Sequence, residues 1–173
     1  MPPVNSVYTL LCWNGIVNEV DVNGFEPASL QDISTECPGF QARATARALT
    51  RYYNSCFKPL GLTAEQFSLL VGIGATEGAT LVELADKAGV DPTTLSRNVQ
   101  NLENRDLVCA EGGRGRAGKR LTLTTSGRQL VVDALPVWNG AKVELARRMG
   151  DEKLRSARQA MMALAEAAES SGN

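Results

Sequence analysis

Apolar residues recur with helical spacing along most of the chain beyond residue 36. Over residues 40–57 the stripe of Ala44, Ala48 and Tyr52 predicts a first long helix, because residues four apart share one helix face. A proline and then Gly61 follow, and both residue types are typical of a helix end.

A capping box predicts where a second helix begins. In Thr63-Ala64-Glu65-Gln66 the threonine hydroxyl and the glutamine amide can satisfy backbone N–H groups of the first turn. The apolar positions that follow are Phe67, Leu69, Leu70 and Ile73. Three glycines, Gly72, Gly74 and Gly78, are expected to bound this helix loosely.

Two shorter helices come next, separated by a tight turn. A second capping box at residues 80–83 predicts the first, and Gly89 supplies the left-handed residue that ends it. Asp91 can cap the next helix, which places Leu95, Val99 and Leu102 on its buried side. Two helices joined by a glycine-containing turn predict a helix-turn-helix.

Burial of that apolar stripe leaves a polar face on the second helix of the motif. Arg97 and Gln100 on this face are side chains that pair with guanine and adenine edges in a major groove. A merely solvated polar surface is the alternative. The candidate DNA-reading residues are Thr93, Thr94, Ser96, Arg97 and Gln100.

A basic hairpin is expected after the helix-turn-helix. Residues 107–110 and 120–124 have strand character, and the glycine-rich stretch 112–118 between them predicts a flexible tip. Residues 112–128 contain five cations and no acidic residue, which favours contacts with phosphates or a minor groove over an ordinary solvated tip. The candidates are Arg114, Arg116, Lys119 and Arg120.

The segment from residue 113 to 119 also has the spacing of a nucleotide-binding phosphate loop. However, Arg120 stands where a magnesium-binding Ser or Thr belongs, and the glycines lead into a strand instead of a helix. Nucleotide binding is therefore not expected.

Two long helices are predicted over residues 126–148 and from Asp151 to about Glu169, with Pro136 bending the first. Their apolar residues are too numerous for helices lying alone. They pack either against a second subunit or into an ordinary core of the same chain, and the residues favour neither.

Composition narrows the function. The chain has 173 residues, 43% of them hydrophobic, a formal charge of −1, four cysteines and no histidine. Without histidine, a clustered metal-ligand set or a working phosphate loop, an enzyme ranks last, and no metal or cofactor is expected. The widely spaced cysteines and the lack of a signal peptide or membrane span predict a cytoplasmic protein.

The order of elements and several local strings resemble the MarR family of winged-helix transcriptional regulators over residues 37–169. The strings are Pro59-Leu60-Gly61-Leu62-Thr63, Gln66-Phe67, Leu84-Ala85, Asp91-Pro92-Thr93-Thr94-Leu95-Ser96-Arg97, Leu102-Glu103 and Leu123-Thr124-Thr125-Ser126-Gly127.

The resemblance implies a homodimer that represses transcription from a roughly palindromic double-stranded DNA operator. It also implies release by a small aromatic or phenolic effector. Arg51, Tyr52, Tyr53 and Phe67 lie on helices that would line the effector cleft, with core packing or dimer contact as the alternative for each aromatic residue.

We therefore expect a mostly α-helical chain with a small β-wing: a winged helix-turn-helix DNA-binding region plus a helical dimerisation region. The expected division is an arm of unknown role (1–35), a first dimerisation helix (36–62), the winged helix-turn-helix (63–124) and the C-terminal dimerisation helices (125–173).

Two departures from the family pattern qualify the resemblance. The wing lacks the aspartate that steadies its arginine, because Gly115-Arg116-Ala117 occupies that region. Cys37 lies near the position of the reactive cysteine of redox-responsive members. However, when this sequence is aligned with the family through Leu60-Gly61-Leu62-Thr63, Gly39 falls at the position of that cysteine. The alternatives are thus a thiol-based regulator that uses Cys37, or a winged-helix protein-interaction module without DNA specificity.

Overall fold

The computed structural model describes residues 33–76, 78–112 and 118–170. The expected arm at residues 1–35 lies almost wholly outside this range, as do Arg114 and Arg116. The chain divides into two units at residues 46 and 47, so the packing below concerns the second unit, residues 47–173.

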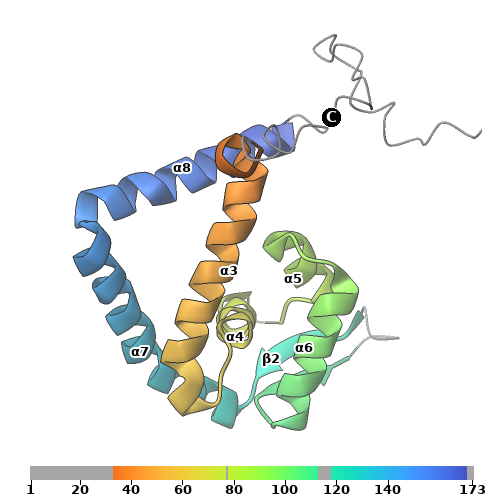
Figure 1. Ribbon diagram of the computed structural model, residues 1–173. Helices are drawn as coiled ribbons and strands as arrows, with labels where there is room; N and C mark the ends of the chain where they lie inside the picture. The colour runs from red at the N-terminus through yellow and green to blue at the C-terminus, as the bar shows by residue number, and fades with distance from the viewer. Residues whose placement is uncertain (1–32, 77, 113–117, 171–173) are drawn as a thin grey trace, which may run out of the picture. The chain divides into compact units, whose positions relative to one another are not determined.

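Helices form most of the described chain (Figure 1). The elements are α3 (Pro38–Phe57), the 3-10 helix η2 (Lys58–Leu60), α4 (Ala64–Thr76), α5 (Leu81–Ala88), α6 (Pro92–Asn104), β1 (Val108–Glu111), β2 (Arg120–Leu123), α7 (Thr125–Met149) and α8 (Asp151–Glu169). The mostly α-helical fold with a two-stranded hairpin is the one expected from the sequence.

The predicted caps fix the helix ends. At α5 the Thr80 hydroxyl accepts from the Glu83 N–H at 3.3 Å, and the Glu83 carboxylate accepts from the Thr80 N–H at 2.7 Å. Gln66 and Thr63 form the same reciprocal pair before α4. Gly61 and Gly89 adopt the left-handed conformation at the ends of η2 and α5.

The prediction that glycines bound α4 loosely is wrong, because the helix continues through Gly72 and Gly74 to Thr76. A β-carbon at Gly74 would lie 3.0 Å from the Leu123 side chain on β2. This glycine therefore permits close approach of the hairpin to α4, and tertiary contact outweighs its low helix propensity.

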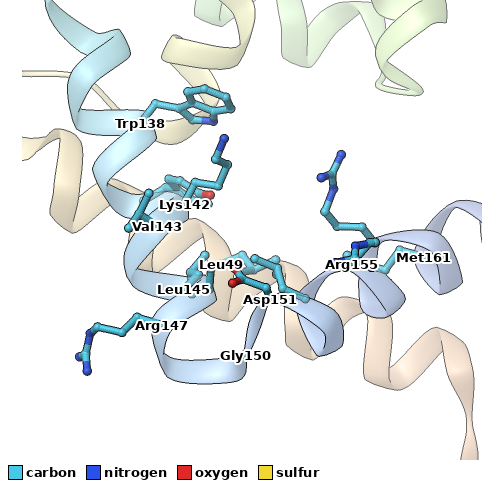
Figure 2. A pocket seen from close by; sticks show the side chains of 14 residues that line it. Leu49, Trp138, Lys142, Val143, Leu145, Arg147, Gly150, Asp151, Arg155 and Met161 are labelled. Carbon is cyan, nitrogen blue, oxygen red and sulfur yellow. The ribbon is translucent and has the colours of Figure 1, made fainter.

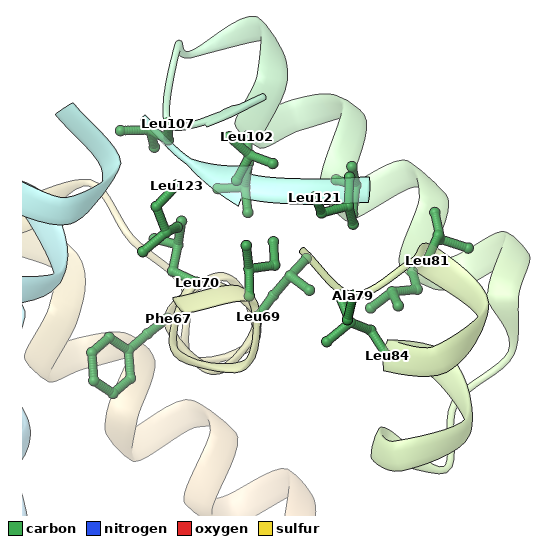
Figure 3. Packing of buried hydrophobic residues seen from close by; sticks show 14 of the residues in the cluster. Phe67, Leu69, Leu70, Ala79, Leu81, Leu84, Leu102, Leu107, Leu121 and Leu123 are labelled. Carbon is green, nitrogen blue, oxygen red and sulfur yellow. The ribbon is translucent and has the colours of Figure 1, made fainter. Parts of the chain in front are cut away.

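One hydrophobic core joins α4, α5, α6 and the hairpin (Figure 3). All of the apolar positions predicted for α4 and α6 are buried, and Leu70, Leu102 and Leu121 are at most 2% exposed. Removing such a side chain from water stabilises the fold by about 1.5–3 kcal/mol. The core thus fixes the two helices of the helix-turn-helix and the hairpin relative to one another.

The hairpin is antiparallel, with Val108 opposite Leu123 and Glu111 opposite Arg120. Leu121 and Leu123 point into the core, so the alternate positions of β2 are exposed. An isolated bridge between Thr80 and Arg120 adds the segment before α5 to the free edge of β2.

The two C-terminal helices differ in burial. α7 runs unbroken through Pro136 and buries Gly127, Ala134 and Ala141, whereas none of the residues of α8 is buried. Large apolar side chains on both helices are exposed in the single chain: Val132, Leu135, Trp138, Val143, Met161, Met162 and Leu164. Within the described residues, no helix is both long and apolar enough to cross a membrane.

The first turn of α7 packs against the backbone of Leu107, the residue before β1. A β-carbon on Gly127 would overlap the Leu107 carbonyl oxygen, which already accepts the Thr124 N–H. We expect Gly127→Ala to lower the free energy of unfolding by about 1–3 kcal/mol, because the added methyl group overpacks a backbone contact.

Urea unfolding would measure this loss. Gly140→Ala is the matched control on the same helix, because its added methyl group would meet no other part of the protein within 4 Å beyond the neighbouring residues and backbone of α7. It should stabilise the protein by about 0.5–1 kcal/mol through helix propensity alone. Equal changes in the free energy of unfolding for the two substitutions would contradict the close contact between Gly127 and the Leu107 carbonyl.

Candidate nucleic-acid interface

The buried stripe of α6 orients its polar face. Leu95, Val99 and Leu102 are 7%, 4% and 0% exposed and hold the helix against the core. Of the predicted reading residues, Thr93, Thr94, Arg97 and Gln100 are exposed, and Ser96 is half-buried. The structure thus places Thr93, Ser96, Arg97 and Gln100 on one face of α6, whereas Thr94 lines a cavity between α4, α5 and α6.

The first turn of α6 is capped within the protein. The Asp91 carboxylate accepts from the N–H groups of Thr93 at 2.9 Å and Thr94 at 3.2 Å. Hydrogen bonds from Thr94 and then Thr93 hold the pKa of Asp91 below its usual range. Because Asp91 also hydrogen-bonds the Thr93 side chain, the cap holds both the backbone and one side chain of this turn within the protein.

Hydrogen bonds also order the margins of α6. The Gln100 amide donates to Asn104 at 3.3 Å, and Gln66 on α4 donates to Asn101 at 3.0 Å. Arg105 donates to the same Gln66 side chain at 3.5 Å. Ordering before binding reduces the entropy that a reading surface loses when it contacts its partner.

The wing lies beside α6 in the folded chain. Lys119 is exposed and, with Gln100 and Glu103 of α6, lines a recess of about 160 Å³ between the helix and the hairpin. Arg120 is also exposed, but its Nη1 donates to the Gly78 carbonyl at 2.9 Å. The contact of Arg120 with DNA stays a prediction, and one of its N–H donors is already used in a hydrogen bond within the protein.

The four effector candidates do not share one cavity. Tyr52 donates its hydroxyl to the Ala141 carbonyl at 2.9 Å, Phe67 is 8% exposed in the core, and Arg51 is exposed. Tyr53 lines a concavity of about 1160 Å³ between α3, α7 and α8, where Trp138 and Val143 also lie (Figure 2).

A second cavity, of about 560 Å³, lies between α4, α5 and α6. We call it the helix-turn-helix cavity. Small residues open it, Leu84 and Val90 make its walls apolar, and Lys87 is its cation. This cavity was not predicted from the sequence. Its signal was the set of small residues on facing helices, namely Ser68, Gly72, Ala75 and Ala88.

Comparisons with known proteins agree with this geometry. A model of the MarR family matches residues 60–117. The Mycobacterium tuberculosis transcriptional regulator MosR is 35% identical, with a TM-score of 0.70 over 79% of this chain and 98% of that chain. The chain belongs to the MarR family. It is a DNA-binding transcriptional regulator.

Further solved structures of MarR-family proteins show bound molecules. MosR in complex with DNA is 34% identical, with a TM-score of 0.70 over 80% of this chain and all of that chain. The M. tuberculosis MarR-family protein Rv2887, in complex with salicylic acid, is 26% identical, with a TM-score of 0.57 over 73% and 95% of the two chains. Curated protein sequences give no significant match.

The described cysteines of this MarR-family chain, Cys37, Cys56 and Cys109, are free thiols. Cys37 precedes α3 and is half-buried, and its sulfur and the Arg43 guanidinium flank Gly39. Cys109 on β1 donates to the Glu111 carboxylate at 3.4 Å, and this hydrogen bond raises the pKa of its thiol. Among the described residues no cluster of Cys, Asp or Glu could hold a metal ion. A redox role of Cys37 stays a prediction.

Proposed function

We propose that this MarR-family protein is a cytoplasmic homodimeric repressor that acts by binding and not by catalysis. Two copies of α6 read the half-sites of a roughly palindromic operator, the wings contact flanking DNA, and a small aromatic effector releases the complex. The exposed face of Thr93, Arg97 and Gln100 above a fully buried stripe carries this proposal.

Arg97 is the side chain of α6 best suited to read a base. It is exposed at the centre of the polar face, and its planar guanidinium can donate two hydrogen bonds to a guanine edge. Arg97→Ala should weaken binding to the upstream DNA of the gene by about 1–3 kcal/mol and leave binding to a scrambled duplex nearly unchanged.

Fluorescence anisotropy with both duplexes at two salt concentrations would measure this loss of discrimination. Lys58→Ala, which removes an exposed cation from η2, is the control and should preserve the ratio of the two affinities. If the wild-type protein bound both duplexes equally, sequence-specific reading would be refuted and the protein-interaction module would be favoured.

The exposed apolar surface of α7 and α8 supports the homodimer. Val143 is 56% exposed, Met161 is 48% exposed, and both line the concavity beside Tyr53. A second copy of the same helices supplies an apolar surface of matching kind, as twofold symmetry requires. This arrangement supports the proposed division into dimerisation helices and a DNA-binding region.

Val143→Glu should convert the dimer into monomers and thereby abolish tight operator binding. An unpaired carboxylate at a dry interface should cost roughly 3 kcal/mol or more, because desolvation of a charge costs several kcal/mol. Analytical ultracentrifugation would measure the association. Val82→Glu on α5 is the control, and a dimer that survived Val143→Glu would place the interface elsewhere.

The helix-turn-helix cavity supports effector control. Its volume of about 560 Å³ fits a small aromatic molecule, and Lys87, which lines the cavity together with Glu65, can pair with a carboxylate of that molecule. Salicylic acid and p-aminosalicylic acid are bound to Rv2887. An occupant wedged between α4, α5 and α6 shifts the population of conformations in which α6 is placed for reading.

Ala88→Leu should fill part of this cavity and make operator binding insensitive to an aromatic acid that releases the wild-type protein. Operator binding in the presence of increasing salicylate would measure the effect. Val82→Leu, on the same helix but outside the cavity, should respond as the wild type does. Release that persisted unchanged in the Ala88→Leu protein would exclude this cavity as the effector site.

A further inference from the structure

Arg120 begins β2 on the exposed face of the hairpin, yet its side chain turns back to the protein. Its Nη1 donates to the Gly78 carbonyl at 2.9 Å. A β-carbon on Gly78 would lie 3.9 Å from the Arg120 Cδ and 4.0 Å from its Cβ. The aliphatic part of the arginine therefore passes over the glycine, in ordinary van der Waals range of where a side chain would begin.

The backbone around Arg120 joins the same two segments. Thr80 forms an antiparallel bridge with Arg120, and the Leu121 N–H donates to the Ala79 carbonyl at 3.0 Å. Gly78 has a φ of +96°, a backbone conformation that residues with a side chain rarely adopt. The segment Gly78–Thr80 is thus an added edge of the wing.

The same segment is the start of the helix-turn-helix. Thr80 is the cap of α5, held by its reciprocal hydrogen bonds with Glu83. Those hydrogen bonds are the main cause of the lowered pKa of Glu83, and the charge of Arg120 adds to them. Leu84 of α5 lies in the same hydrophobic core as Leu95 of α6, so the segment that begins α5 is packed together with α6.

We propose that Arg120 is a positioning residue that fixes the wing to the first turn of α5 and so sets the wing relative to α6. It is not a phosphate contact. This inference rests on the proposed reading of DNA by α6 and the wing, and it reassigns one of the cations expected to contact DNA.

Arg120→Met, which keeps an unbranched stem and removes the guanidinium, tests the proposal beside Lys119→Met. Lys119 is the adjacent exposed cation. Comparison of the two variants therefore distinguishes loss of a positive charge near the DNA from loss of the contact that positions the wing. Affinity for the upstream DNA is measured over a salt series. Hydrogen exchange of the free proteins is measured at residues 78–83 and in the α4 core, and circular dichroism shows that each variant is folded.

Loss of a phosphate contact lowers the slope of log affinity against log salt by about 0.9. We expect that loss for Lys119→Met and an unchanged slope for Arg120→Met. The folded Arg120→Met protein should bind the upstream DNA about fivefold more weakly, because a factor of this size corresponds to the free energy of one intramolecular hydrogen bond. Its amides at residues 78–83 should exchange faster while those of the α4 core do not. Arg120→Lys, which keeps a donor and the charge, should recover part of the affinity and protection.

A slope reduced by Arg120→Met as much as by Lys119→Met would overturn the proposal, and so would unchanged exchange at residues 78–83. An affinity equal to that of the wild type would also overturn it. If the wild-type protein bound no duplex even at low salt, the DNA-reading function would fail instead. The exchange data would still decide whether Arg120 holds this segment.

Discussion

The burial of one apolar stripe on α6 is the constraint on which the rest of the structure depends. Leu95, Val99 and Leu102 recur at the spacing of a helix face and lie in one core with residues of α4, α5 and β2. Once that face is inside, the opposite face is outside, and the side chains there are polar. The same contacts that stabilise the fold therefore orient the residues that we propose to read DNA.

Local signals were enough to predict much of this arrangement. Each cap depends on residues within one helical turn, as in Thr80 with Glu83 or Asp91 with Thr93, so the sequence itself contains both partners. The hairpin strands were predicted to within a residue because alternation and glycine-rich turns are also local. The apolar stripes of α4 and α6 followed from periodicity alone.

Features that depend on distant contacts could not be predicted in this way. Gly74 lies within α4 because Leu123, 49 positions along the chain by their numbering, packs against it, and no local pattern reveals that neighbour. Phe67 was a candidate for an effector cleft, but it packs 4.5 Å from Phe57, centroid to centroid, in the core. The cavity between α4, α5 and α6 is formed by small side chains that meet only after folding.

The C-terminal helices connect the proposed dimer surface to the proposed DNA-binding region. α8 is a 19-residue helix with no buried residue in the single chain, although it carries Met161, Met162 and Leu164. Amphipathic helices in proteins owe most of their stability to packing of the apolar face. The exposed apolar side chains of α8 are therefore expected to pack against another protein surface. The long helix α7 begins at the end of the wing and leads to α8. A partner bound at these helices would therefore be connected through one continuous element to the hairpin and to α6, and the geometry of the dimer would set the separation of its two reading helices.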